Sequence, residues 1–338
     1  MKAIKIFEPG DMQLVECEKP RITGDTDILV KVAAAGICGS DVHIFHGRNP
    51  YAKYPVIPGH EESGVVEAVG PGVTKFKVGD RVVVEPIQYC GRCYPCRIGR
   101  PNVCEELQVY GCHLNGGFAE YMLAAEAATH RIPASVSFKQ AALIEPLTIG
   151  AQAMYRTGAR IGDLCLIHGA GPIGLITLTL AKQNGLTAMV SEPSDARRAM
   201  AKEFGADLVI HPMEEDLAAK VMDFTDGKGA NIIFDAVGVP ALVEQSIPLL
   251  SAAGRFLEFG YGFGAGKVDF DRMNKLELTV MGLRHQTFRF DPVIDIFPSI
   301  LDKVDKIQTH TFALEQFEEA FRTFTDKNSG ACKVTFLL

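Results

Sequence analysis

The second half of the chain alternates short apolar runs with amphipathic stretches, and this rhythm constrains the fold more than any other feature. Six runs rich in apolar residues have strand length: 164–168, 188–192, 207–210, 232–236, 255–259 and 277–281. The stretches between them, such as 194–204 and 214–224, carry apolar residues at helical spacing. Strands that alternate with helices form a parallel sheet covered by helices, and six strands suit a doubly wound α/β domain.

A glycine-rich loop joins the first of these strands to the first helix. It reads Gly169-Ala170-Gly171-Pro172-Ile173-Gly174, between an apolar strand and an apolar helix. The first glycine permits a tight turn, the second lets the backbone approach a pyrophosphate, and the third lets helix and strand pack closely. This loop is therefore the predicted dinucleotide-binding site.

The predicted cofactor is NAD, because Glu192 ends the next strand, 18 residues after Gly174. A carboxylate there binds the ribose 2′-hydroxyl of NAD and repels the 2′-phosphate of NADP. The simpler alternative is a strand-end glutamate in solvent. Arg197 is a further candidate for cofactor binding and leaves NADP open, but Arg197 and Arg198 also suit the exposed surface of the next helix.

The first 145 residues have a different character, with short β-branched runs at 28–32, 64–69 and 81–84 that glycine and proline interrupt. They predict an irregular, barrel-like β domain. After residue 282 two helical stretches, near 292–301 and 314–325, and a last strand at 333–337 remain. This tail is too short for a core of its own, so we expect it to return to the first domain.

The charge and hydropathy of the chain limit the kinds of molecule that it is expected to bind. The net charge of −7 argues against nucleic acid or an anionic membrane, and no apolar run approaches the ~20 residues of a membrane span. We therefore expect a cytoplasmic protein, where disulfides rarely persist.

Four of the nine cysteines, Cys90, Cys93, Cys96 and Cys104, have the spacing of a closed tetrahedral site. Four thiolates leave no open coordination position, so this pattern predicts a structural zinc. A redox dithiol or an iron–sulfur cluster are the less favoured alternatives, since a redox pair needs two cysteines and no βαβ context surrounds these.

A second metal site is predicted from Cys38 and from His60 with Glu61. Cysteine, histidine and carboxylate are zinc ligands, and a catalytic zinc needs three of them plus an open position. The third ligand is a carboxylate, either Glu61 or one from farther along the chain.

These motifs together resemble the zinc-dependent medium-chain dehydrogenases, the alcohol and polyol dehydrogenase superfamily. The resemblance spans the chain in order and rests on the following segments: 36–43, Gly59-His60-Glu61-x-x-Gly64, 78–82, the four cysteines, 116–121 and the glycine loop. It implies a GroES-like zinc catalytic domain formed by residues 1–147 and 285–338, and a Rossmann NAD-binding domain formed by residues 148–284. It also implies a homo-oligomer, as a tetramer or a dimer.

Within the superfamily the chain resembles the sorbitol, threonine and sugar-acid branch. Glu145 stands where classical alcohol dehydrogenases have a third zinc cysteine; in this branch Glu61 ligates instead, and the two glutamates can exchange. Residues 46–55 and 93–96 most resemble bacterial L-galactonate, L-gulonate and L-idonate 5-dehydrogenase-like proteins. Ile44 departs from sorbitol dehydrogenases, which have a tyrosine there. The implied substrate is a polyol or sugar acid, with hexonate 5-dehydrogenase as the best match.

The resemblance also implies residue roles. Zinc would act as a Lewis acid on a secondary alcohol, with hydride transfer to the nicotinamide. The proton would leave through Ser40 and His43, and Asp41 would orient a ligand histidine. Arg284, at the end of the last Rossmann strand, is a candidate substrate contact, although a surface ion pair explains it equally. Rival functions are a primary-alcohol dehydrogenase and a zinc- and NAD-binding protein without turnover.

Overall fold

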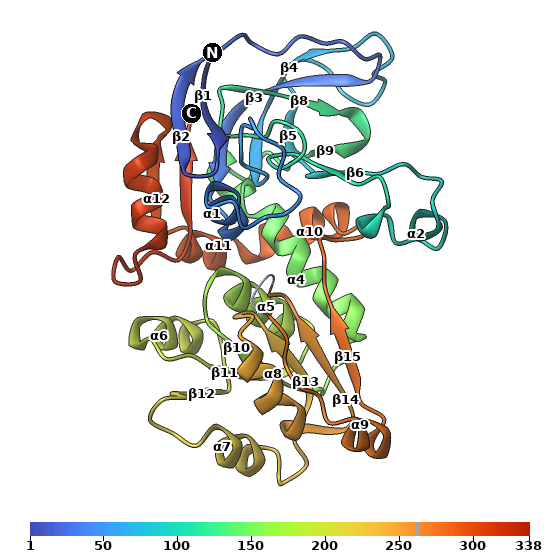
Figure 1. The fold of residues 1–338 in the computed structure, drawn as a ribbon, viewed down its shortest axis with the longest axis vertical. Helices are drawn as coiled ribbons and strands as arrows, with labels where there is room; N and C mark the ends of the chain where they lie inside the picture. Colours follow the sequence, from blue (N-terminus) through green and yellow to red (C-terminus); the bar gives the residue numbers. More distant parts are fainter. Residues whose placement is uncertain (261–263) are drawn as a thin grey trace. The chain divides into compact units, whose positions relative to one another are not determined.

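The computed structural model describes residues 1–260 and 264–338. The chain divides into two compact units: the first comprises Met1–Thr148 and Thr287–Leu338, and the second comprises Ile149–Gln286. Both chain ends therefore lie in the first unit (Figure 1). None of the described helices is both long and apolar enough to cross a membrane.

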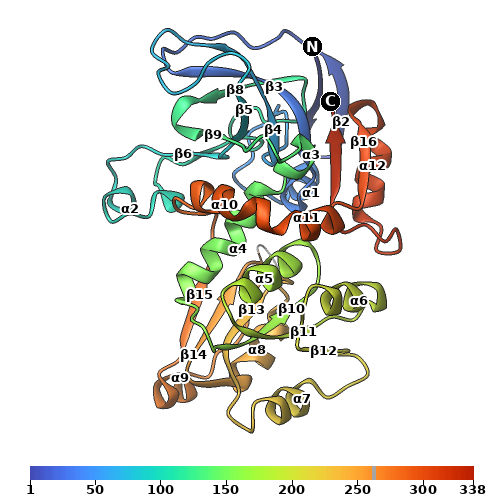
Figure 2. The same ribbon diagram turned by 180° about the vertical axis from the view of Figure 1, so that it is seen from behind.

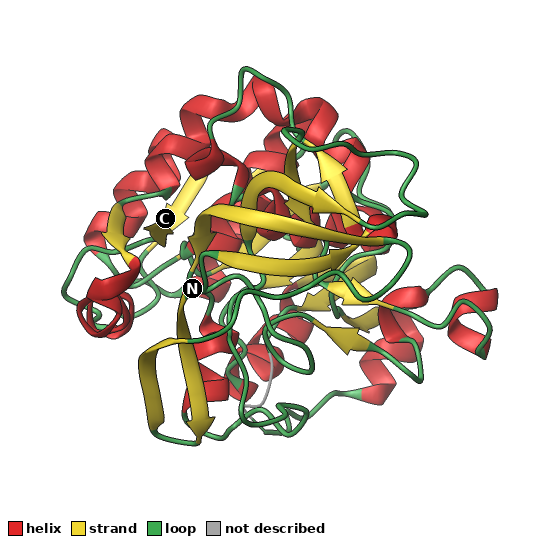
Figure 3. Cartoon of the chain, turned by 90° about the horizontal axis from the view of Figure 1, so that it is seen from above, coloured by secondary structure: helices red, strands yellow, loops and turns green. Residues whose placement is uncertain are grey.

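A seven-stranded sheet organises the first unit, with β3 at its centre. The strands follow the order β16-β17-β3-β4-β5-β9, and β8 pairs with β3 as well. Figure 3 shows the strands of the chain in yellow. Two small antiparallel pairs, β1–β2 and β6–β7, complete the strands of this unit. The strand bounds are β1 Lys2–Glu8, β2 Asp11–Glu16, β3 Asp27–Gly36, β4 Glu62–Val69, β5 Arg81–Val84, β6 Ile87–Gln88, β7 Gln108–Val109, β8 Tyr121–Ala125, β9 Thr129–Arg131, β16 His310–Ala313 and β17 Val334–Leu337.

The first unit also contains six short helices among its described residues. They are α1 Gly39–Phe45, α2 Tyr94–Arg97, α3 Phe138–Ala141, α10 Phe290–Ile296, α11 Leu301–Ile307 and α12 Phe317–Thr325, with 3₁₀ turns at Pro101–Val103, Glu126–Ala128, Phe297–Ile300 and Leu314–Gln316. The core between sheet and helices joins residues from both ends of the chain, including Val30, Phe118, Phe321 and Phe336. Because β17 pairs with β3 through Phe336 and Ala35, the C-terminal tail is an integral part of this core.

The second unit is a six-stranded parallel sheet in the order β12-β11-β10-β13-β14-β15 (Figure 2). The strand order reverses between β10 and β13, and ligands of open α/β sheets bind at the carboxyl ends of the strands at such a point. The strands are β10 Leu164–His168, β11 Thr187–Ser191, β12 Leu208–Ile210, β13 Ala230–Asp235, β14 Leu250–Glu258 and β15 Thr279–Gly282. The helices are α5 Pro172–Gln183, α6 Asp195–Glu203, α7 Leu217–Phe224, α8 Pro240–Ser246 with a 3₁₀ turn at Ile247–Leu249, and α9 Phe270–Leu276.

The predicted fold class, a β-rich domain with a doubly wound α/β domain, is confirmed. Two helical features differ from the sequence patterns. The tail helix expected near residues 292–301 is α10, a 3₁₀ turn and α11, which together span residues 290–307. In addition, α4 (Ile144–Thr157) was not predicted as a helix. Its Pro146 lies in the first turn, where a missing N–H costs little.

Candidate active site

Cys38, His60 and Glu61 come together in the first unit, with their ligand atoms within 4.8 Å of one another. Cys38 is the N-cap of α1, and His60 and Glu61 lie in the loop directly before β4. A thiolate, an imidazole and a carboxylate are a donor set that fits zinc and leaves a fourth position open. The structure thus unites the two sequence segments from which a catalytic metal site was predicted.

Asp41 connects these two segments and is fully buried. Its Oδ2 accepts the backbone N–H of Cys38 at 2.9 Å, and its Oδ1 accepts that of Gly59 at 3.2 Å. The same Oδ1 lies 3.4 Å from Nδ1 of His60. With Nδ1–H directed to Asp41, the imidazole keeps its lone pair on Nε2 for a metal. Burial lowers the pKa of His60, but Asp41 and then Cys38 outweigh it and raise this pKa well above its usual value, so a bound metal would displace a proton from Nε2.

Ser40 and His43 lie one turn apart on α1. The Ser40 hydroxyl is 3.3 Å from Nε2 of His60, so it lies beside this predicted metal ligand. Burial lowers the pKa of His43, with smaller contributions from Arg48 and His46. A proton path through Ser40 and His43 stays a prediction.

Glu145 lies in the first turn of α4 and is buried, but it is not one of the three residues whose ligand atoms cluster. Burial raises its pKa to about 7; the neighbouring His60 opposes this shift and the Glu61 carboxylate adds to it. Of the two predicted carboxylates, Glu61 therefore has the geometry of a ligand. Glu145 lies within electrostatic reach of both His60 and Glu61, where it can accept a proton or orient a hydroxyl.

Two buried charged residues of this site were not predicted from the sequence. Glu62 is fully buried directly after Glu61, and burial raises its pKa well above the usual value. Lys333, directly before β17, extends its ammonium to Oε2 of Glu61 in an ion pair with both side chains almost fully buried. Neither residue stands in a recognisable metal-ligand pattern, so the sequence offered no signal for them.

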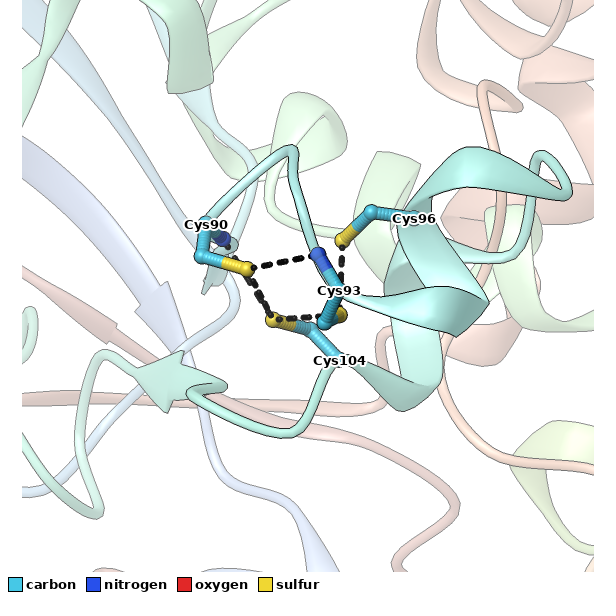
Figure 4. A group of neighbouring side chains, drawn as sticks. All are labelled: Cys90, Cys93, Cys96 and Cys104. Atoms are coloured by element: carbon cyan, nitrogen blue, oxygen red, sulfur yellow. Dashed lines mark hydrogen bonds between the residues drawn. The ribbon is translucent and has the colours of Figure 1, made fainter.

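The four-cysteine site is compact, with all four sulfurs within 4.8 Å of one another. The Sγ atoms of Cys93 and Cys96 are 3.4 Å apart, and Cys104 lies 3.5 Å from Cys90 (Figure 4). Backbone N–H groups also point at the sulfurs, such as that of Cys90 at Cys104. The Glu105 N–H is the main cause that lowers the pKa of Cys93 to about 6. Four converging sulfurs with N–H support fit a structural zinc.

The glycine loop of the second unit has the geometry of a phosphate cradle at the N-terminus of α5. Gly169 has a φ of +86°, and a side chain at Gly174 would collide with the carbonyl oxygen of Gly169. In contrast, a Cβ at Gly171, the N-cap of α5, would meet no described atom within 4 Å. The loop therefore packs against itself at its outer glycines and leaves space at the middle one, as a pyrophosphate requires.

Glu192 has a structural role that the sequence did not reveal. Its Oε2 accepts the N–H of Ala170 in the glycine loop at 2.7 Å, and its Oε1 accepts the N–H of Ser194 at 2.9 Å. A carboxylate offers about four acceptor positions, so two remain for a ribose. The carboxylate consequently anchors the glycine loop, and its predicted contact with the ribose is untested.

The predicted arginines have different surroundings. Arg198 donates to the carbonyl oxygens of Glu192 and Pro193 and pairs with Asp195, so it stabilises the start of α6. Arg197 is half-buried on the same helix. Arg284 is exposed two residues after β15. Contacts of Arg197 with a cofactor and of Arg284 with a substrate stay predictions.

Comparison with known proteins identifies the family. Residues 24–134 match the alcohol dehydrogenase GroES-like domain, and residues 172–304 match the zinc-binding dehydrogenase domain. The chain belongs to the zinc-binding alcohol dehydrogenases. It is thus an oxidoreductase, and the predicted superfamily is confirmed.

Relatives of this family align with nearly the whole chain. L-threonine 3-dehydrogenase of Pyrococcus horikoshii is 38% identical, with 100% of this chain and 99% of that protein covered. D-arabitol-phosphate dehydrogenase of Enterococcus avium is 37% identical, with 97% and 95% covered. The crystal structure of the alcohol dehydrogenase RspB from Escherichia coli CFT073 with NADH has a TM-score of 0.95 and 36% identity, with 100% and 99% covered. The predicted cofactors, zinc and a nicotinamide dinucleotide, agree with this family.

Proposed function

We propose that the protein oxidises a secondary hydroxyl of a polyol or sugar acid to the ketone, with hydride transfer to NAD. The best candidate position is the C5 hydroxyl of a hexonate. The observation that carries this proposal is the donor set of Cys38, His60 and Glu61 with further polar groups around it. Ser40 and Glu145 add a hydroxyl and a carboxylate that a polyhydroxylated substrate would pair.

Zinc bound at Cys38, His60 and Glu61 would supply Lewis acidity to the reacting hydroxyl. The chain itself holds the ligands through Asp41, positions Ser40 beside Nε2 of His60, and keeps Glu145 buried with a pKa near neutrality. A small primary alcohol would leave Ser40 and Glu145 without partners. Sites built to hydrogen-bond a substrate hydroxyl discriminate strongly against analogues that lack it.

The relatives support the substrate class, since one of them is named for a polyol phosphate and another for threonine, which also carries a secondary hydroxyl. Identity of 38% over the full length makes L-threonine the second candidate substrate. For the cofactor, Glu192 at the end of β11 supports NAD over NADP. We further propose that the chain works as a homo-oligomer, because β15 is an edge strand on which Val280 is partly exposed. A cytoplasmic location is proposed as well.

The experiment is a screen of NAD reduction with C5 and C6 polyols, aldonates, L-threonine and short primary alcohols, each repeated with NADP. Cys38→Ser serves as the inactive control, since it removes a ligand without touching the glycine loop. We expect kcat/KM to be highest for a hexonate with NAD. Primary alcohols that turn over as well as any polyol or sugar acid would refute the substrate class.

Arg284 tests the preference for an acid. An Arg fork suits a carboxylate, so Arg284→Ala should raise KM for an aldonate more than for the matching neutral polyol. An equal loss for both substrates would show that Arg284 is no carboxylate ligand.

A further inference from the structure

Lys333 is a buried cation to which the proposed chemistry assigns no role. Its side chain is 4% exposed, and its Nζ forms an ion pair with Oε2 of Glu61, whose side chain is 2% exposed. The lysine thus places its ammonium beside a ligand of the predicted catalytic metal site.

The backbone around Lys333 is fixed from both sides. Its N–H donates to the carbonyl oxygen of Ile307 at 3.1 Å, and its own carbonyl oxygen accepts the N–H of His310 at 3.2 Å. The side chain also crosses Gly36, where an added Cβ would lie 3.0 Å from Cε of Lys333 and would collide with Oε2 of Glu61. The absence of a side chain at Gly36 thus makes room for this ion pair, which is a built feature of the site.

The charges around the ligands favour a cation at this position. Glu61 and Glu145 are two buried carboxyl groups next to the other predicted ligands, Cys38 and His60. Asp41 is a separate anion, and it is already held by the N–H groups of Cys38 and Gly59. Lys333 pairs its ammonium with the Glu61 carboxylate at a buried place, where an anion without a partner is costly.

On the basis of the proposed function, we propose that Lys333 is a positioning residue for the third zinc ligand. By pairing with Oε2 of Glu61, Lys333 would hold this carboxylate beside Cys38 and His60, so that Glu61 would be retained as the ligand in preference to Glu145. Lys333 acts through Glu61 and has no contact with the reacting atoms in this proposal.

The test uses the full-length protein and two metal measurements. Lys333→Met keeps most of the length of the side chain and removes its charge. Since residues that orient a ligand typically contribute 10–100-fold in metal affinity, we expect zinc at Cys38 to dissociate from this variant about 10–100-fold more readily in chelator competition. In Co²⁺-substituted protein, the absorption of this site, taken as the difference from Cys38→Ser, should shift because the carboxylate ligation changes.

Two background variants separate positioning from a general charge effect. In the Glu61→Gln background, we expect Lys333→Met to change neither the zinc affinity at Cys38 nor the Co²⁺ spectrum any further. In the Glu145→Gln background, Lys333→Met should lower the zinc affinity and shift the Co²⁺ spectrum as much as it does in the otherwise unchanged protein. An unchanged affinity and spectrum in Lys333→Met, or an equal effect in both backgrounds, would overturn the proposal.

Controls for folding and for the proposed function complete the design. Zinc retained at the four cysteines and unchanged NADH fluorescence titration report that both units are folded. If Lys333→Met does not fold, Lys333→Gln should lower the affinity and Lys333→Arg should keep it, and the opposite order refutes the role. If Cys38→Ser leaves the Co²⁺ spectrum unchanged, Cys38 does not bind the metal, and both the metal site and the proposed function are refuted. If the protein is inactive with every polyol, the proposed function is refuted, but the comparison of metal affinities still tests the role of Lys333.

Discussion

Replacement of Glu192 by alanine should both destabilise the protein and weaken its choice of cofactor. The carboxylate accepts the buried N–H of Ala170 and the partly buried N–H of Ser194. A hydrogen bond to a charged group contributes about 1.5–3 kcal/mol, and a buried donor left without a partner costs a similar amount. Counting Ala170 in full and Ser194 at about half, Glu192→Ala should lower the free energy of unfolding by roughly 3–4 kcal/mol.

At about 2–4 °C per kcal/mol for a domain near the size of the second unit, this loss corresponds to a Tm lowered by about 10 °C. Glu192→Gln offers one acceptor oxygen in place of two, so its Tm should fall about half as far. The matched control is Glu214→Ala, an exposed glutamate whose contact with His211 is 3.5 Å long. Its Tm should stay within about 2 °C of the wild type, in line with ordinary surface substitutions.

Fluorescence titration with NADH and NADPH measures the second effect. In Glu192→Gln we expect NADH to bind about tenfold more weakly, since one ribose hydrogen bond is worth about 1.4 kcal/mol. NADPH should bind at least as tightly as before, because a repulsive charge is gone. Wild-type protein that binds NADPH as tightly as NADH would refute the cofactor assignment, and a Glu192→Ala Tm equal to that of the control would refute the anchoring role.

Three further predictions address metal content, pH dependence and assembly. Metal analysis should find two zinc ions per chain. Cys93→Ser should lower Tm and retain one zinc, whereas Cys38→Ser should abolish turnover with the fold intact. Full activity without zinc would contradict both roles. Burial and the nearby Asp235 raise the pKa of Glu258 to about 7. Between about pH 4.5 and 7 the folded protein therefore keeps a proton that the unfolded chain releases. The free energy of unfolding consequently falls as the pH rises through this range. Glu258→Gln should therefore raise Tm above pH 7 and leave it unchanged near pH 4.5, while exposed Glu319→Gln stays flat; an equal gain at both pH values would exclude the carboxyl titration. Light scattering should show a dimer or tetramer, and a monomer at working concentration would contradict the use of β15 as a subunit edge.

The parts of the site that follow from the sequence are those with a local pattern. Three short motifs have a spacing that by itself predicts the kind of site: the glycine loop, the four cysteines, and the pair of His60 and Glu61. The alternation of strands and helices likewise predicts the order of elements in the second unit. These signals are local because each depends on the backbone of one turn or one strand.

The parts that escaped prediction depend on contacts between distant segments. Lys333 meets Glu61 only because β17 pairs with β3 beside the loop that precedes β4. Glu192 contacts Ala170 because β11 lies next to β10. No periodicity in the sequence encodes such pairings. Burial of Glu62 was equally invisible, since two adjacent glutamates ordinarily indicate an exposed turn.

The division of the first unit between both ends of the chain has a consequence for biosynthesis. Residues 149–286 form one continuous unit, whereas β17 and Lys333 are translated only after it. The second unit can thus fold on the ribosome while β3 still lacks its neighbour β17 and Glu61 lacks its cation. We therefore expect nascent chains halted shortly after the second unit has left the ribosome to resist protease over residues 149–286 while holding metal weakly at Cys38. We expect the glycine loop to form during synthesis and the predicted catalytic metal site to be completed only after β17 has left the ribosome.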